Sequence, residues 1–432
     1  MRRIDPQRFR IATRGTSRQI NRQIALALIN SREAVSRADL ARHMKLRRGA
    51  IGLLIQELLN EGHIVEGDAG QAPRGRKPTL LYINTRQRSS VAVDIRASGT
   101  FLMLADAIGG PRSSIVTIRT PRTPRRLVAA LARRIRKLLA AHPDAGRCEG
   151  VGVIVPGMVD HATSRVIHAP TLGWRNVDIR DALAAATGLP VHVENSGRAC
   201  ALAQVWVGRT IAAPVRDLVF VSVSDGVGVG VVVNGELLRG RHNIAGEFAH
   251  MPLSLDGPRC SCGASGCWEA HISNPATLAR YAGSGDVGRR ASGVGGRNRR
   301  AAGAGRTNKD KDKASDNDAR TVRPFTIDDL MDRGRRGETH AMAALQVTAR
   351  YLGVGLGAIV NILNPDCIFI GGEITSVWDL IEGTVRAGLA ERALTPAAAH
   401  ATIVVVGAEE HPRLRGAAML VSAPAFAAPV VA

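Results

Sequence analysis

A cysteine-rich stretch, GEFAHMPLSLDGPRCSCGASGCWEA at residues 246–270, constrains the fold of this chain more than any other feature. Its three cysteines follow the spacing C-x-C-x4-C and begin ten residues after a histidine. Three thiolates and one imidazole meet the needs of a closed tetrahedral zinc site, and two loop glycines allow the bend that brings the sulfurs together. No coordination position is left open, so the zinc is expected to be structural. The predicted ligands are His250, Cys260, Cys262 and Cys267.

The alternative for this stretch is a set of unliganded thiols or a disulfide pair. Disulfides are disfavoured in the cytosol, and the start of the chain lacks the apolar region of a secretory signal. No run approaches about 18 uninterrupted apolar residues, so we expect a cytoplasmic protein without membrane contact. The other cysteines stand singly in apolar surroundings typical of buried core thiols, at Cys148, Cys200 and Cys367.

The composition is that of an ordinary globular protein, with 432 residues, 45% hydrophobic and 22% charged, and the length allows two or three domains. A net charge of +21 favours a polyanionic partner, although an arginine-rich proteome would give the same total. Residues 1–88 hold 18 Lys and Arg against 7 Asp and Glu, so 18 − 7 = +11 of the excess lies there.

Residues 283–323 lack large apolar side chains, which predicts a disordered insertion, either a solvated loop or an accessory DNA contact.

Residues 16–62 have the pattern of three helices. The expected apolar stripe of the first helix is Ile20, Ile24 and Leu28. Ser36, three residues before Asp39, is a predicted cap for a short second helix. A turn at Lys45 leads into the third helix, RRGAIGLLIQELLNEG, which ends at a glycine stop.

Two β-rich runs around a glycine-rich, basic tip follow these helices, so residues 1–86 are predicted to form a winged helix-turn-helix domain. In such a domain the third helix enters the major groove and the wing lies along the phosphate backbone. An arginine fork at the helix start can bond a guanine edge. The alternative is a protein-interaction or dimerisation module. The predicted DNA contacts are Arg47, Arg48, Arg74, Arg76 and Lys77.

The cysteine-rich stretch resembles the signature of the ROK family of sugar kinases and sugar-responsive repressors. The family pattern consists of G-E-x-G-H and, about ten residues later, C-x-C-G-x-x-G-C-x-E. This chain has GEFAH and CSCGASGCWE, and it departs from the pattern at Ala249. The likeness extends to GVIVPGMVD at 152–160, VHVEN at 191–195 and VNILNPDCIFIGGEI at 360–374. The predicted winged helix followed by GRKP and LLYIN is similar to the repressor branch, which includes the xylose and N-acetylglucosamine repressors.

The resemblance implies an α/β fold whose body is an actin-like ATPase (ribonuclease H-like) pair of lobes with a sugar in the cleft. The expected boundaries are 87–200 for the first lobe and 201–432 for the second, which carries the zinc loop 246–270 and the insertion 283–323. The resemblance also implies that one imidazole bonds both sugar and zinc. The implied sugar-binding residues are the backbone near Gly157 and the side chains of Asn195, Glu247, His250 and Glu269. For the two glutamates, the alternative is a pair of exposed loop carboxylates.

Three departures from the kinase members predict that no catalytic residue and no phosphoryl transfer remain. Ser196 stands where the kinases carry aspartate, and a serine hydroxyl is a poor general base. Arg96 replaces a glycine of the first phosphate loop, and Asp225 adds negative charge beside the second.

The predicted function is therefore a sugar-responsive repressor, not an enzyme. Its expected partners are double-stranded operator DNA, a sugar effector and further copies of the chain in a homodimer or tetramer. The alternatives are a sugar kinase with an appended DNA-binding domain and an architectural protein that has lost sugar binding.

Overall fold

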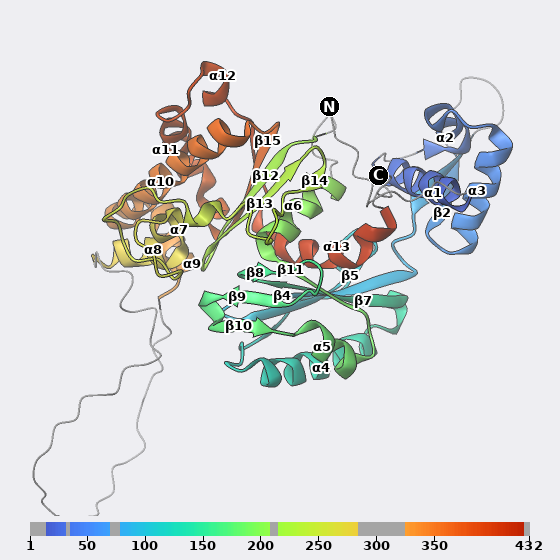
Figure 1. Ribbon diagram of the computed structural model, residues 1–432, viewed down its shortest axis with the longest axis horizontal. Coiled ribbons are helices and arrows are strands. Elements are labelled where there is room, and N and C mark those ends of the chain that lie inside the picture. The colour runs from blue at the N-terminus through green and yellow to red at the C-terminus, as the bar shows by residue number, and fades with distance from the viewer. Residues whose placement is uncertain (1–13, 32–34, 70–77, 208–214, 284–324, 427–432) are drawn as a thin grey trace, which may run out of the picture.

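The computed structural model describes residues 14–31, 35–69, 78–207, 215–283 and 325–426 (Figure 1). The predicted wing tip at 70–77 and the predicted insertion from 284 to 323 lie outside these residues. The described part consists of a small N-terminal unit, drawn in blue in Figure 1, and a body built on two five-stranded sheets.

The N-terminal unit contains three helices and a three-stranded antiparallel sheet of order β1-β3-β2. Its elements are α1 (Arg14–Ser31), β1 (Val35–Ser36), α2 (Arg37–Met44), α3 (Arg48–Asn60), β2 (Ile64–Ala69) and β3 (Thr79–Ile83). Ser36 caps α2 as expected: its Oγ accepts the Asp39 N–H at 3.2 Å, and Asp39 Oδ2 accepts the Ser36 N–H at 3.0 Å. The turn before α3 is made by Lys45, whose φ is 54°.

The buried face of α1 differs from the predicted stripe. Leu26 and Ile29 are buried, whereas Ile24 is 39% exposed. The helix lies against α2, β3 and α13 (Pro412–Phe426), the last of which is some 400 residues away in the chain. The prediction was wrong at Ile24, while Leu28 is partly buried against the core of the unit. A helix with apolar residues on adjoining rows can bury either row, and its neighbours decide which.

The first sheet of the body has the order β11-β7-β4-β5-β6, with β4 parallel to β7 and antiparallel to β5. Helices cover both of its faces, α4 and α5 on one and α13 on the other, so the central strand β4 is buried along nearly all of its length (Figure 1). Its elements are β4 (Arg88–Ile95), β5 (Thr100–Asp106), β6 (Val116–Ile118), α4 (Pro124–Ala140), β7 (Arg147–Val155), α5 (Arg180–Thr187) and β11 (Val191–Asn195), with a small sheet of β8 (Met158–Val159), β9 (Val166–Ala169) and β10 (Trp174–Val177) at its edge.

The second sheet repeats this topology in the order β14-β13-β12-β15-β16, again with a central strand that is antiparallel to one neighbour and parallel to the other. Its strands are β12 (Leu218–Val223), β13 (Val227–Val233), β14 (Glu236–Leu237), β15 (Cys367–Gly372) and β16 (Ile403–Val405). Its helices are α6 (Ser196–Val207), α7 (Trp268–Ile272), α8 (Asn274–Tyr281), α9 (Ile327–Arg335), α10 (Thr339–Leu363), α11 (Trp378–Ala390) and α12 (Pro396–Ala399). The largest hydrophobic core joins this sheet to α10 and α11.

Two helices, α6 and α13, lie between the sheets and pack against each other (Figure 1). The expected boundary at residue 200 falls inside α6, and α13, expected with the second lobe, covers the first sheet. The lobes therefore exchange helices, because each sheet needs both of its faces covered.

The core helix α10 is long and apolar enough to cross a membrane, and it is the one such helix in the described residues. In the structure 61% of its most apolar window is buried against the second sheet and its helices. The expected core thiols also fit: Cys200 and Cys367 are buried, which raises the pKa of their thiols to about 12 and about 11, while Cys148 is half-buried.

Candidate functional site

A cleft of about 700 Å³ of empty space, part of it open to solvent, lies where the strand ends of the two sheets face each other. All the residues that the sequence predicted for sugar binding line it, and so does Ser196, the replacement for the kinase aspartate. The predicted sugar residues that the fold brings together are Gly157, Asn195, Glu247, His250 and Glu269.

The floor of the cleft is set by Asn195 and Gly157. Asn195 ends β11, and its side-chain amide donates to the Gly157 carbonyl at 2.8 Å. Gly157 has a φ of 131°, and a Cβ there would lie 2.3 Å from the His168 carbonyl oxygen. Only glycine allows this close approach, which brings backbone from the first sheet against the cleft.

Glu269, at the start of α7, holds the cysteine-rich loop against the second sheet. Its Oε2 accepts the Val227 N–H at 2.9 Å, and its Oε1 accepts the Ser261 hydroxyl at 2.9 Å. Because Ser261 lies between two of the predicted metal ligands, the Glu269 carboxylate connects the cysteine-rich loop to the wall of the cleft.

Glu247 has no hydrogen-bond partner for its carboxylate among the described residues. Burial raises the pKa of this carboxyl group, the nearby Arg198 guanidinium and His250 imidazole offset part of that rise, and Glu269 adds to it. A ligand that brings hydroxyl donors would complete the hydrogen bonding of this carboxylate.

Arg198 is a residue that sequence reasoning missed. It is buried, and its guanidinium donates to the carbonyls of Asn243 at 2.7 Å and Ala245 at 3.2 Å, so it fixes the loop that leads to Glu247. The available signal was a lone cation in the helix sequence SGRACALAQVWV.

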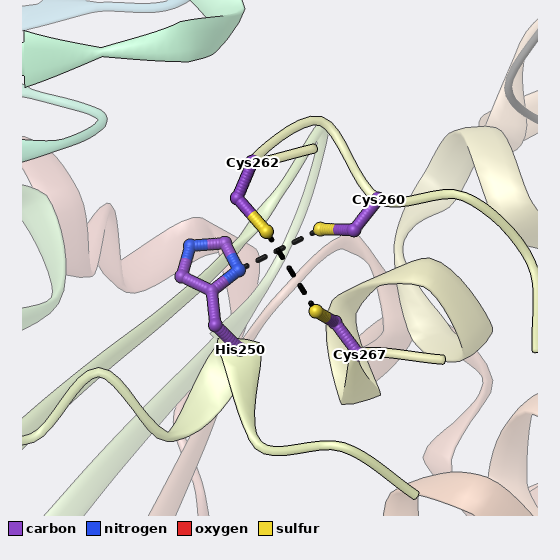
Figure 2. Close-up of side chains that lie close together, drawn as sticks. All are labelled: His250, Cys260, Cys262 and Cys267. Atoms are coloured by element: carbon purple, nitrogen blue, oxygen red, sulfur yellow. Dashed lines mark hydrogen bonds between the residues drawn. The ribbon is translucent and has the colours of Figure 1, made fainter. Parts of the chain in front are cut away.

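The predicted metal ligands converge on one point, and one of them, His250, also lines the cleft (Figure 2). One donor atom from each of His250, Cys260, Cys262 and Cys267 lies within 4.8 Å of all the others. The Sγ atoms of Cys262 and Cys267 are 3.7 Å apart, and Cys260 Sγ lies 3.6 Å from His250 Nδ1. These separations match the edges of a tetrahedron around an ion with bonds of about 2.3 Å to sulfur and about 2.0 Å to nitrogen. The cluster can hold a metal ion, and the thiols are not paired in disulfides.

The two ring nitrogens of His250 point in different directions. Its Nδ1 is the atom turned towards Cys260, while the other ring nitrogen points away from the three sulfurs (Figure 2). The same residue lines the cleft. A metal ion bound at Nδ1 would therefore fix the ring that borders the cleft.

Comparison with known proteins identifies the body. The sequence pattern of the ROK family matches residues 92–423. The chain belongs to the ROK family. It is 27% identical over 380 residues to the xylose repressor of Caldicellulosiruptor bescii, covering 87% of this chain and 88% of that protein. It is 28% identical over 307 residues to the glucokinase of Streptomyces coelicolor, covering 69% and 86% respectively.

A solved ROK family transcriptional regulator, a homologue of the E. coli MLC protein, has the same fold. The two structures align with a TM-score of 0.71 at 24% identity, covering 95% of this chain and 97% of that one. The N-terminal unit of this ROK protein precedes the residues that match the family pattern. Because the alignment with the regulator covers 95% of this chain, most of the unit lies within it.

Three of the exposed cations of the N-terminal unit lie close together in the chain. Lys45, Arg47 and Arg48 are exposed at the turn into α3, with no carboxylate partner among the residues that the structure describes. Most other arginines of the unit are paired, namely Arg18 with Glu57, Arg22 with Glu61, Arg37 with Glu66 and Arg42 with Asp39. The predicted wing contacts Arg74, Arg76 and Lys77 lie outside the described residues.

The exposed face of α3 holds a second feature that the sequence reading did not single out. Leu53 is 72% exposed, and a Cβ added at the neighbouring Gly49 or Gly52 would meet no atom within 4 Å. This face is therefore narrow and uncharged, with the cations at its N-terminal end.

Proposed function

We propose that this ROK protein is a sugar-responsive transcriptional repressor. The observation that carries the proposal is the combination, in one chain, of a polar cleft lined by Asn195, Glu247 and Glu269 with an N-terminal unit whose free cations flank an exposed helix. The likeness to a xylose repressor over 87% of the chain supports it.

The N-terminal unit, residues 1–86, acts as a winged helix-turn-helix. Its third helix α3 enters the major groove, where Arg47 and Arg48 reach base edges. The tip residues Arg74, Arg76 and Lys77 lie along the phosphate backbone. Support comes from the pairing of the unit's acidic residues with other arginines, which leaves the cations at the start of α3 for DNA.

The effector is a sugar or sugar derivative held by the backbone near Gly157 and the side chains of Asn195, Glu247, His250 and Glu269. Carboxylate and amide groups can each hydrogen-bond two vicinal hydroxyls. An apolar pocket could not distinguish sugar epimers in this way. The carboxylate of Glu247 supports this assignment, because it lines the cleft without a hydrogen-bond partner among the described residues and can accept hydroxyl donors.

The metal of the cluster is zinc, and it is structural. Three thiolates and one imidazole match zinc, and the four ligands leave no open position. Zinc would hold the loop of Cys260 and Cys262 and fix the His250 ring from one side, leaving the other ring nitrogen for the sugar.

The repressor acts as a homodimer or tetramer in the cytoplasm, because one winged helix reads few base pairs and two half-sites are needed for useful specificity. Sugar binding changes the angle between the lobes and so the spacing of the paired DNA-binding units. The coupling between the two sites amounts to about 1–3 kcal/mol and is reciprocal.

The central experiment is selection of DNA by the purified full chain from a random duplex library, followed by fluorescence anisotropy on the enriched sequence. We expect one of D-xylose, D-glucose or N-acetylglucosamine at millimolar concentration to weaken DNA binding about tenfold. A protein that ignores every duplex at low ionic strength contradicts the proposal.

Variants assign the roles on the DNA. Arg47→Ala is expected to relax sequence preference, while Arg76→Ala weakens binding to all sequences and lowers its salt dependence. Arg18→Ala, whose guanidinium is already paired with Glu57, is the matched control and should bind like the wild type. Equal effects of the first two variants on a scrambled operator would refute these roles.

A second candidate, a sugar kinase with an appended DNA-binding domain, is favoured by the glucokinase relatives. Against it, Ser196 lines the cleft in place of an aspartate, and the guanidinium of Arg96 lies in the cleft as well. We therefore expect no ADP release in a coupled assay across a hexose panel. Turnover within about tenfold of an ordinary sugar kinase would establish the second candidate instead.

A further inference from the structure

Arg96 connects the two sheets across the cleft. It follows β4 of the first sheet, where its Nε donates to Asp94 Oδ2 at 2.7 Å and its guanidinium lies 4.9 Å from the centre of the Phe101 ring. Its Nη1 crosses to the second sheet and donates to Glu373 Oε1 at 2.8 Å, with Ser224 Oγ at 3.4 Å.

The acceptors on the far side are held in place by their own lobe. Glu373 follows β15, and its Oε2 accepts the side-chain amide of Asn274 at 3.0 Å. A second link runs beside the first, because Asp225 Oδ2 accepts the Ser98 N–H at 3.3 Å. One loop of the first sheet, between β4 and β5, thus faces two strand ends of the second sheet through direct polar contacts.

The charges show why Arg96 is available for this contact. Asp94 is fully buried, and Arg413 of α13 already binds both of its carboxylate oxygens, at 2.8 and 2.7 Å. Arg96 is therefore not required to neutralise Asp94 alone. The side chains of Arg96 and Glu373 are 21% and 25% exposed, so their ion pair is less screened by solvent than a pair on the surface.

We infer that Arg96 is a tether between the two lobes, joining β4 of the first sheet to Glu373 of the second without any nucleotide. The loops that it connects, 94–100 and 224–226, are those that resemble the phosphate loops of ROK kinases. A guanidinium in the chain thus supplies the link that a bound ligand would otherwise make, and the cleft is assembled before a sugar arrives. Arg96 is a positioning residue, since it acts on the sugar site through the lobes.

Hydrogen exchange measured by mass spectrometry on the full chain tests the tether without any ligand. Arg96→Met removes the charge but leaves Asp94 paired with Arg413, and Glu373→Gln removes the charge from the other side. Each variant is expected to speed exchange about three- to tenfold on both walls of the cleft, in peptides covering 94–101 and 222–228. The double variant should add nothing beyond Arg96→Met, because Glu373→Gln removes only the ion pair that Arg96→Met already breaks.

Arg88→Met is the matched control. Arg88 pairs with Glu149 at 3.1 Å with similar exposure, 24% and 30%, but both residues belong to the first sheet. Loss of the Arg88–Glu149 ion pair should leave the rate of hydrogen exchange in residues 222–228 unchanged. If Arg96→Met or Glu373→Gln speeds hydrogen exchange only on the mutated side of the cleft, the proposed tether is refuted.

A second measurement follows the consequence for the effector and rests on the proposed function. With D-xylose and D-glucose as probes in calorimetry, Arg96→Met is expected to bind the better sugar about three- to tenfold more weakly than wild type, since part of the lobe arrangement must then form on binding. Unchanged affinity contradicts this consequence. If wild type binds no sugar, the proposed function fails, while the exchange measurement still decides the tether.

Discussion

His63 is one of several histidines whose lowered pKa is expected to make the fold sensitive to acid. His63 follows α3, and its Nε2 lies 3.3 Å from Glu61 Oε2. Burial, aided by the cations of Arg88 and Arg22, lowers the pKa of His63 from 6.5 to about 4. The unfolded chain takes up a proton near the ordinary pKa, whereas the folded chain resists it until about pH 4. Stability supplied by neutral His63 is therefore present above pH 6.5 and is lost as the pH falls towards 4.

His63→Gln should accordingly blunt the acid sensitivity. Between pH 7 and pH 5 the wild type is expected to lose about 1 to 2 kcal/mol more of its free energy of unfolding than the variant. Urea denaturation at the two pH values measures this difference. His43→Gln, at an exposed position, serves as the control and should follow the wild type. Parallel losses in His63→Gln and wild type would disprove the assignment.

Gly157 and Gly173 allow a comparison of two glycines with positive φ. A Cβ at Gly157 would lie 2.3 Å from a carbonyl oxygen, whereas nothing lies within 4 Å of one at Gly173. We expect Gly173→Ala to cost about 1 kcal/mol of stability from backbone conformation alone. Gly157→Ala should cost about 3 kcal/mol or more and abolish sugar binding, because backbone must move at the cleft. Thermal unfolding and calorimetry record both effects, and equal behaviour of the two variants would count against the role of Gly157.

At the scale of elements, the sequence predicted local structure well and packing partners poorly. Local sequence patterns were enough to predict the capped start of α2, the Lys45 turn and the extent of α3, because each depends on residues close together in the chain. The buried row of α1 and the position of α13 depend on surfaces hundreds of residues away. Nothing in the sequence of α13 states that it covers the first sheet.

The attachment of α13 gives an element-scale prediction. Arg413 is buried and binds Asp94 through two nitrogens, so Arg413→Met leaves that buried carboxylate with one cation instead of two. We expect the free energy of unfolding to fall by about 2–4 kcal/mol. Arg415→Met, on the same helix but paired with the exposed Glu410, should cost less than about 1 kcal/mol. Chemical denaturation of both variants tests this, and similar losses would contradict it.

For the whole molecule, the site was more predictable than the arrangement that forms it. The spacing of the cysteines and the likeness to the ROK family pointed to residues that do converge at one cleft. Arg198 and the far-side partner Glu373 could not be predicted, because their roles arise only when loops distant in sequence meet. The sequence shows that Arg96 replaces a glycine of the first phosphate loop, but only the structure shows that its guanidinium contacts both lobes.

Removal of the metal is expected to act on the sugar site from a distance. Cys262→Ser should lower zinc content, measured by atomic absorption, and weaken sugar binding about tenfold or more, because the His250 ring and the Ser261 contact lose their support. Cys148→Ser, outside the cluster, should retain the metal and bind sugar normally. A full sugar response in zinc-free protein would refute the link.

The place of α13 between the two sheets has a consequence for biosynthesis. Its residues leave the ribosome after both sheets have been made, yet one face of the first sheet stays bare until they arrive. Domains usually mature in the order of translation; here the earlier lobe must wait for the later one. An interrupted polypeptide would thus leave one face of the first sheet uncovered, an apolar surface of the kind that chaperones and proteases recognise.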